Sequence, residues 1–233
     1  MATILCIESA TPICSIALVQ NGIVTHIRET DELQSHAASL MVFIQQVLIS
    51  AGLTVSAIDA IAVSKGPGSF TGLRIGVSTA KGLCFAQDKP LIGIGTLKSM
   101  AIGMIKAYQI SETSLLFCPM IDARRMEVYT ALYDINANEL IPVSAKIIDE
   151  SSFAKVLKNQ TIVFAGDGSV KCRALLEHHP NACFLNQEIV SAANMASLSN
   201  DAFLNGLFEN VAYFEPYYLK DFIPGKSIVK GLH

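Results

Sequence analysis

Short apolar runs open the chain, each long enough for a strand and too short for a helix. They occupy residues 3–8, 14–20 and 24–30, and they are separated by Ser-Ala-Thr-Pro and by Asn21-Gly22. Asn-Gly between two apolar runs is a strong signal for a hairpin. The pattern therefore predicts that the chain begins with an antiparallel meander of three strands.

The apolar period then changes from that of a strand to that of a helix. Ser35 can cap this helix and Gly52 ends it. Its apolar positions follow helical spacing, at Leu40, Phe43, Ile44, Val47 and Leu48. The pattern next predicts a strand, a helix, a short strand and a helix, at residues 58–64, 70–87, 91–94 and 96–107.

The second half of the chain repeats this order. Strands are expected at 114–121, 127–134, 140–148 and 161–165, with helices from residue 150 or 151, after Gly166-Asp167-Gly168, and at 192–208. A repeated order of elements indicates an internal duplication. We therefore expect two lobes, residues 1–110 and 111–233, with their boundary near residues 109–112.

Composition narrows the class of protein. Of 233 residues, 51% are hydrophobic and only 16% are charged, which is enough for a large core with apolar surface left for a partner. The net charge of −3 and the absence of a Lys/Arg cluster argue against a chain that grips nucleic acid alone. No apolar run reaches the roughly 18 residues of a membrane span, and the first residues lack the basic region of a signal peptide. A cytoplasmic protein is expected, with no membrane partner.

The sequence lacks the usual catalytic spacings. Leu40 follows His36 where a helical metal pair would need a second histidine, and Val63-Ser64-Lys65-Gly66 lacks the first glycine of a nucleophile elbow. The six cysteines show no C-x-x-C spacing and are typical of buried thiols in a reducing compartment. No catalytic, cofactor-binding or metal-ligating residue is predicted.

A glycine-rich run, SKGPGSFTGLRIGVSTAKGL, covers residues 64–83 and resembles a phosphate loop in composition only. A P-loop, G-x-x-x-x-G-K-[ST], needs a second glycine five residues after the first. Thr71 and Leu73 stand at that position after Gly66 and Gly68. Thr71 also occupies the third glycine of a dinucleotide fingerprint, and Pro67 removes a backbone donor. The run therefore needs another purpose.

Helical geometry suggests one. Arg74, Ser78 and Lys81 form a narrow polar stripe on an otherwise apolar or small-residue helix. Gly72 and Gly76, one turn apart, would leave a groove in which a helix of another subunit could pack. The alternative, equally open, is that this helix is central to its own domain.

Two further segments each have two interpretations. Residues 7–11, Ile-Glu-Ser-Ala-Thr, lie where sugar kinases and actin place an acidic residue and a glycine against phosphate and magnesium. Here Ser9 stands in place of the glycine that lets the backbone approach phosphate. The alternative interpretation is an ordinary tight turn. Residues 122–129, DARRMEVY, form the densest charged patch. It is either functional or a solvated hairpin opening with local salt bridges.

The runs GPGSFTGLRIGVSTAKGL and IDARRMEVYTALY, the turn GDGS and the hairpin ILCIESA–CSIAL together resemble the TsaB (YeaZ) family. This family is the non-catalytic subunit for bacterial synthesis of tRNA threonylcarbamoyladenosine (t6A). The resemblance covers most of the chain; it is weaker after Pro180, although PYYLK at 216–220 is similar to the family's P-x-Y-L-R ending. Glu8 stands where the family usually has Asp, which argues further against an independent nucleotide site.

The resemblance implies an α/β, actin-like ATPase fold (ASKHA, ribonuclease H-like) of two duplicated lobes, with mixed sheets flanked by helices. It implies that the chain pairs with TsaD, joins TsaE and contacts tRNA only through the complex. It implies no cofactor on this chain alone, and it leaves open whether ATP or ADP binds at the interface of the complex. The same surface would serve a homodimer when TsaD is absent. The expected partner-binding residues are Leu40, Phe43, Ile44, Val47, Phe70, Leu73, Arg74, Gly76, Val77 and Ala80.

Two other classes of function stay open from the residues. One is a stand-alone phosphotransferase of the same fold that uses ATP and holds magnesium through Glu8. The other is a homodimeric interaction protein.

Overall fold

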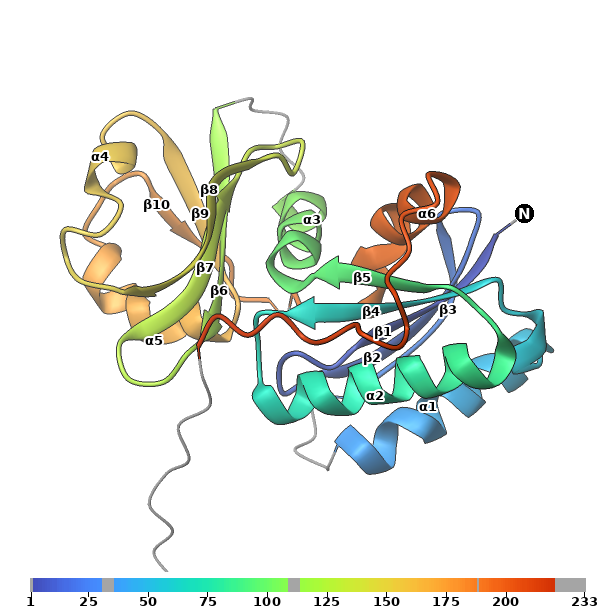
Figure 1. Ribbon diagram of the computed structural model, residues 1–233. Helices are drawn as coiled ribbons and strands as arrows, with labels where there is room; N and C mark the ends of the chain where they lie inside the picture. The colour runs from blue at the N-terminus through green and yellow to red at the C-terminus, as the bar shows by residue number, and fades with distance from the viewer. Residues whose placement is uncertain (1, 31–35, 109–113, 188, 221–233) are drawn as a thin grey trace, which may run out of the picture.

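The computed structural model describes residues 2–30, 36–108, 114–187 and 189–220, and these form two lobes, each built on a five-stranded mixed sheet (Figure 1). The first sheet has the order β3-β2-β1-β4-β5. Its first three strands are the predicted antiparallel meander, and β4 and β5 join in parallel. The strands are β1 (Thr3–Glu8), β2 (Cys14–Gln20), β3 (Ile23–Thr30), β4 (Ala60–Gly66) and β5 (Leu91–Gly95).

The second sheet repeats this topology in the order β8-β7-β6-β9-β10. Three antiparallel strands are again followed by two parallel ones. The strands are β6 (Leu115–Asp122), β7 (Glu127–Tyr133), β8 (Glu139–Ile147), β9 (Thr161–Ala165) and β10 (Ala182–Phe184). The matching strand order of the two sheets agrees with the duplication expected from the sequence.

Helices cover both faces of the first sheet. On one face, α1 (His36–Ala51) and α2 (Phe70–Gln87) lie next to each other and bury an apolar cluster against β1, β2 and β4 (Figure 1). On the other face, the short 3-10 helix η2 (Ala192–Met195) and α6 (Ala196–Leu204) bury a second cluster. A further 3-10 turn, η1 (Val55–Ala57), precedes β4. The central strands are therefore apolar on both sides, as continuous hydrophobic runs predict.

The second sheet is also covered on both faces. Helices α4 (Ala154–Leu157) and α5 (Asp167–Leu176) bound a cluster around Phe164, Cys172 and Leu176. The opposite face packs on α3 (Thr96–Tyr108), which leaves the first sheet at β5 and buries Leu97 and Met100 among side chains of β6 and β9. Helix α3 thus joins the lobes through an apolar core.

The end of the described chain returns to the first lobe. The amide of Glu209 donates to the carbonyl of Leu91 on the edge strand β5, and Phe214 is buried in the core beneath α2. The predicted second lobe, residues 111–233, included this segment, but in the structure residues 192–214 pack on the first sheet. The predicted boundary near residues 109–112 lies outside the described residues, as does the predicted cap Ser35.

Three elements differ between the prediction and the structure. The helix expected from residue 150 or 151 is the single turn α4, which begins at Ala154. The single helix expected at 192–208 is a 3-10 turn followed by α6, which ends at Leu204. Strand β10 was not predicted; its three half-buried residues carry too short a pattern, and only pairing with β9 defines it. Within the described residues, no helix combines the length and the apolar character needed to cross a bilayer.

Candidate functional site

The glycines of the run 64–83 bring α2 against the turn that follows β1. A β-carbon at Gly72 would lie 2.1 Å from the carbonyl oxygen of Ser9, and one at Gly76 would lie 2.1 Å from Ser9 Oγ. Both distances are far below any van der Waals contact. The neighbour of Gly72 is backbone, so only glycine fits there, and a side chain at Gly76 would displace the Ser9 hydroxyl. The predicted groove for a helix of another subunit is therefore wrong at these positions, because this chain's own turn fills it.

Hydrogen bonds close the same contact. The amide of Ser69 donates to the carbonyl of Ala10 (2.6 Å), and Ser9 Oγ donates to the carbonyl of Gly72 (2.9 Å). Ser69 caps α2 by accepting from the amide of Gly72 (3.3 Å). Free amides at a helix N-terminus are what binds phosphate in related loops. Here two of these amides already have protein acceptors.

Glu8 is buried at the end of β1, with 1% of its surface exposed. Its Oε1 accepts from the amide of Ala10 (2.7 Å). Burial raises the pKa of Glu8 to about 7, although hydrogen bonds from Ala10, Ser64 and Ser9 oppose the shift. The Glu8 carboxylate thus accepts a hydrogen bond from the turn that follows it, as the tight-turn interpretation of residues 7–11 predicts. Within the described part of the chain, no group of three or more His, Cys, Asp or Glu side chains is arranged to hold a metal ion.

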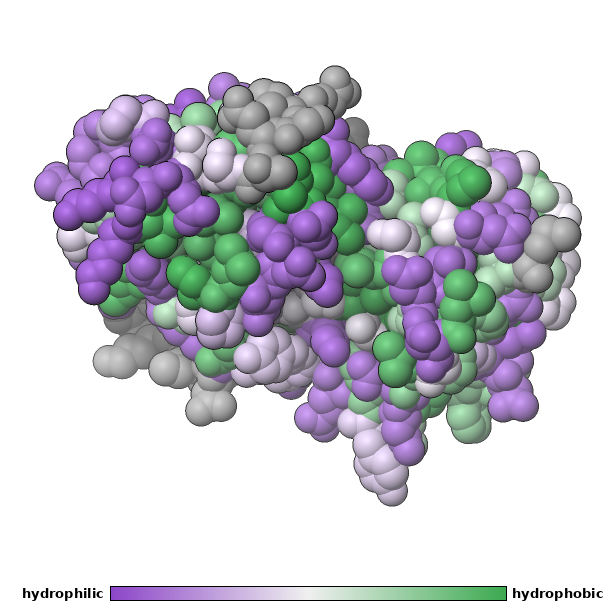
Figure 2. All heavy atoms as spheres, turned by 90° about the horizontal axis from the view of Figure 1, so that it is seen from above, coloured by the Kyte–Doolittle hydropathy of each residue, from purple (hydrophilic) through white to green (hydrophobic). Residues whose placement is uncertain are grey.

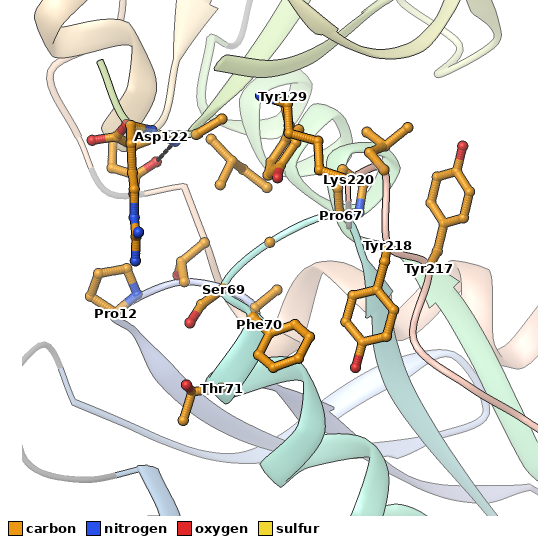
Figure 3. A pocket seen from close by; sticks show the side chains of 18 residues that line it. Pro12, Pro67, Ser69, Phe70, Thr71, Asp122, Tyr129, Tyr217, Tyr218 and Lys220 are labelled. Atoms are coloured by element: carbon orange, nitrogen blue, oxygen red, sulfur yellow. Dashed lines mark hydrogen bonds between the residues drawn. The ribbon is translucent and has the colours of Figure 1, made fainter. Parts of the chain in front are cut away.

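A cavity of about 500 Å³ lies between the lobes (Figure 3). Residues 10–12 and 67–71 line it from the first lobe, residues 121–124, 129 and 167 from the second, and residues 217–220 along one side. Figure 3 shows Phe70 and Tyr218 facing each other on the side of α2, with Asp122 across the cavity. Glu8 is not among the lining residues. The cavity therefore has hydroxyl, aromatic and charged walls but lacks the buried acid that the phosphotransferase interpretation requires.

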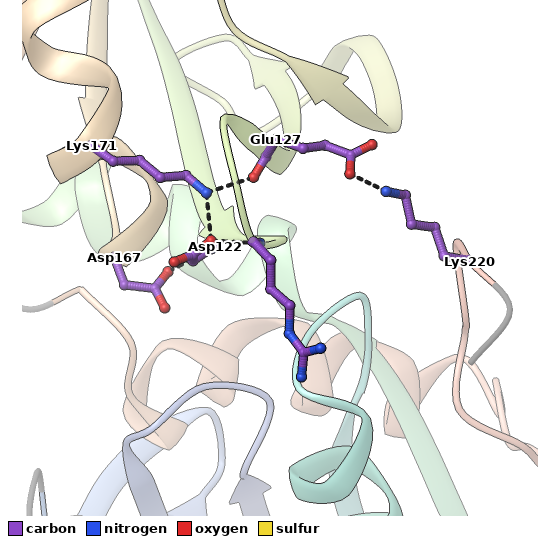
Figure 4. Close-up of polar contacts among 6 residues, drawn as sticks. Asp122, Glu127, Asp167, Lys171 and Lys220 are labelled. Atoms are coloured by element: carbon purple, nitrogen blue, oxygen red, sulfur yellow. Dashed lines mark hydrogen bonds and ion pairs between the residues drawn. The ribbon is translucent and has the colours of Figure 1, made fainter. Parts of the chain in front are cut away.

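The charged hairpin 122–127 is held by residues far away in the sequence (Figure 4). Lys171 donates to Asp122 Oδ1 and to the carbonyl of Glu127, and Asp167 accepts from the amide of Asp122 (3.0 Å). Burial alone would raise the pKa of Asp122, but the bonds from Lys171 and the Arg124 amide lower it. Lys220 pairs with the Glu127 carboxylate. The hairpin is thus an ordered junction rather than a solvated opening with only local salt bridges.

Most of the expected partner-binding residues lie inside the first lobe. Phe43 and Phe70 are half-buried and Arg74 is exposed. The other seven are buried in the core of their own lobe, namely Leu40, Ile44, Val47, Leu73, Gly76, Val77 and Ala80. These seven residues are not available to another subunit while the lobe is folded.

The outer faces of the same two helices carry different apolar residues. On α1, Met41, Val42 and Ile49 are 50%, 47% and 68% exposed, and on α2 Phe85 is 86% exposed. Helical spacing could have found them, because α1 has more apolar positions than one sheet contact can cover. Figure 2, which views the molecule from above, shows hydrophobic and polar side chains mixed over that face. We call Met41, Val42, Ile49 and Phe85 the outer apolar stripe.

Comparison with known proteins places the chain in a family. It is 38% identical over 127 residues to the tRNA threonylcarbamoyladenosine biosynthesis protein TsaB of Haemophilus influenzae, covering 54% of this chain and 52% of that one. It is 38% identical over 135 residues to TsaB of Escherichia coli, covering 58% and 56%. Residues 30–221 match the family model described as TsaD, tRNA N6-adenosine threonylcarbamoyltransferase. The chain belongs to that family, and within it to the TsaB (YeaZ) proteins.

The solved structures agree with this TsaB membership. YeaZ from Pseudomonas aeruginosa superposes with a TM-score of 0.75 at 28% identity, covering 94% of this chain and 100% of that one. The (R)-2-hydroxyglutaryl-CoA dehydratase component A of Acidaminococcus fermentans, at 8% identity and a TM-score of 0.51, covers 89% and 100% and shares the fold. The expected actin-like ATPase fold is confirmed. In sequence, the chain spans about half the length of the curated relatives it matches.

Proposed function

We propose that this TsaB-family chain is a non-catalytic scaffold subunit for tRNA t6A synthesis, which pairs with TsaD and is joined by TsaE. The names of the curated relatives support the process. The observation that carries the non-catalytic role is the packing of the Ser9–Ala10 turn onto α2, because the chain's own backbone takes the place where a phosphate would approach. The burial of Glu8 supports the same conclusion.

The outer apolar stripe supports the location of the contact with TsaD. Large apolar side chains exposed on two neighbouring helices lose contact with water when a partner covers them, and a few such residues usually dominate binding. Arg74 and Ser78 are exposed beside them on α2. The helix pair thus remains the proposed interface, with outward residues in place of the buried ones expected from the sequence. The same face would join two copies of the chain in the absence of TsaD.

The function is tested by supplying this chain, TsaD and TsaE from one genome to Escherichia coli depleted of its own TsaB and TsaD. We expect t6A in the tRNA, measured by mass spectrometry of nucleosides, only when this chain and TsaD are both present. Formation of t6A by this chain without any TsaD would contradict the non-catalytic role. ATP turnover by the purified chain alone would favour the stand-alone phosphotransferase instead.

The interface is tested by Phe85→Glu. The substitution places a charge on a surface that should become dry on pairing, so the Kd for TsaD should rise at least about tenfold. Isothermal titration calorimetry measures the Kd, and the melting temperature should hardly change because Phe85 is exposed. Leu204→Glu at the end of α6, 71% exposed and on the opposite side of the first sheet from α1 and α2, is the matched control. Unchanged pairing by Phe85→Glu would place the interface elsewhere.

A further inference from the structure

Residues 209–220 run from the first lobe to the second lobe (Figure 1), and residues 217–220 line the cavity between them. Their first half is fixed to the first lobe. Glu209 pairs with the edge strand β5 at Leu91, and its carboxylate lies 3.6 Å from Lys65 Nζ. Lys81 of α2 donates to the carbonyls of Ala212 (3.2 Å) and Phe214 (2.8 Å). We call residues 209–220 the clasp.

The middle of the clasp rests on the start of α2. The amide of Tyr217 donates to the carbonyl of Lys65 (2.6 Å). The Tyr218 ring lies 5.1 Å from the Phe70 ring, and its hydroxyl accepts from Arg74 Nε (3.2 Å). The Arg74 guanidinium lies 4.0 Å over the Phe70 ring. These three side chains form one stack, in which Arg74 is exposed while Phe70 and Tyr218 are half-buried.

The far end of the clasp reaches the second lobe at Lys220, which pairs with Glu127 at the end of the hairpin 122–127. That hairpin is held in turn by Lys171 and Asp167 of α5 (Figure 4). On the side of α3 an apolar core joins the lobes. On the cavity side, among the described residues, the clasp supplies the Lys220–Glu127 ion pair between them. Surface ion pairs and stacks of this kind are individually weak and therefore easily exchanged.

We propose that the clasp couples the outer face of α2 to the hairpin 122–127, and that Arg74 is its release point. This inference rests in part on the proposed function, because Arg74 lies on the helix proposed to meet TsaD. Among the described residues no ion pair involves Arg74. A carboxylate on the docking partner would form a charge-assisted bond with Arg74 that is stronger than its present bond to a neutral hydroxyl. Arg74 would then leave Tyr218, and the clasp would loosen its hold on the hairpin.

Hydrogen exchange of the isolated chain tests the coupling. Lys220→Gln should speed exchange of peptides covering residues 122–130 by about three- to fivefold, the range expected for loss of one exposed ion pair. Arg74→Ala should speed exchange in the same peptides, although Arg74 does not contact them, and this remote effect is what a purely local role would not produce. Tyr218→Phe removes only the hydroxyl that accepts from Arg74 and should also speed exchange in these peptides, which gives a milder second variant in case Arg74→Ala disturbs folding.

Matched controls define the outcome. Lys158→Gln removes an exposed lysine of the second lobe, and Tyr213→Ala removes a tyrosine of the clasp that is 84% exposed; neither should change exchange at 122–130. Lys220→Glu combined with Glu127→Lys should restore slow exchange by rebuilding the pair in reverse. If Lys220→Gln and Arg74→Ala both leave exchange at 122–130 unchanged, the clasp does not couple the two sites.

Adding TsaD tests the release step. In the wild-type chain, pairing should speed exchange in residues 215–220 and 122–130 while slowing it in α1 and α2. If the two proteins pair and the clasp peptides do not change, the proposed release at Arg74 is wrong. The coupling through the clasp is tested separately, by hydrogen exchange of the isolated chain. If the two proteins do not associate, the proposed function and the release step are both wrong.

Discussion

Gly72→Ala should destabilise the chain by about 3 kcal/mol or more, or prevent folding of the first lobe. The new methyl group would lie 2.1 Å from the carbonyl oxygen of Ser9, which is backbone and cannot rotate away. Ser9 follows β1, the central strand of the first sheet, and Gly72 belongs to a helix packed on that sheet. Relief of the overlap therefore requires either the strand or the helix to move. Urea denaturation followed by circular dichroism measures the loss.

Gly82→Ala is the matched control in the same helix. A β-carbon at Gly82 meets no atom within 4 Å, and the residue is exposed. Alanine at an exposed helix position is favoured over glycine by up to about 1 kcal/mol, so this variant should be slightly more stable than the wild type. The same substitution should thus have opposite signs ten residues apart. A Gly72→Ala chain with a normal denaturation midpoint would show that the Ser9 turn does not pack on α2 as described.

Glu8→Gln should stabilise the chain at pH 8 and have little effect at pH 5. Burial raises the pKa of Glu8 from 4.5 to about 7 in the folded state. Below pH 4.5 Glu8 is protonated in both the folded and the unfolded chain, so its ionisation does not change the free energy of unfolding there. As the pH rises from 4.5 to about 7, the unfolded chain loses the proton first and the free energy of unfolding falls. Above pH 7 the penalty is constant, at about 3 kcal/mol.

Glutamine keeps an oxygen that can accept from the Ala10 amide but carries no charge at any pH. The variant should therefore lose most of the pH dependence between pH 5 and pH 8 in urea denaturation. Glu177→Gln, which removes an exposed carboxylate at the end of α5, is the control. It should change neither the stability at pH 8 nor the pH dependence appreciably. A Glu8→Gln chain that is less stable than the wild type at pH 8 would mean that hydrogen bonds to the ionised carboxylate outweigh its burial. That result would reopen a role for Glu8 as an anion facing a cation.

The strands were the part of this protein that the sequence predicted best. Strands β1, β2 and β9 begin and end where the apolar runs do, and the meander follows from Asn21-Gly22. These features are local, because a run of alternating or continuous apolar residues and a turn dipeptide act over a few neighbours. The repeated order of elements indicated two lobes for the same reason, and motif resemblance identified the family.

The site depended on contacts that no local pattern contains. Leu40 and Met41 are neighbours on one apolar helix, yet one is buried and the other is half exposed, since the position of the sheet decides which side of α1 is covered. Gly72 and Gly76 indicated close packing correctly, but only the fold shows that the close neighbour is Ser9. The clasp joins Lys220 to Glu127 across 93 positions of the chain. The sequence by itself determined the elements and the family, because periodicity and motifs are local; the tertiary structure alone decided which apolar faces remain outside and which distant residues meet, because burial depends on the whole fold.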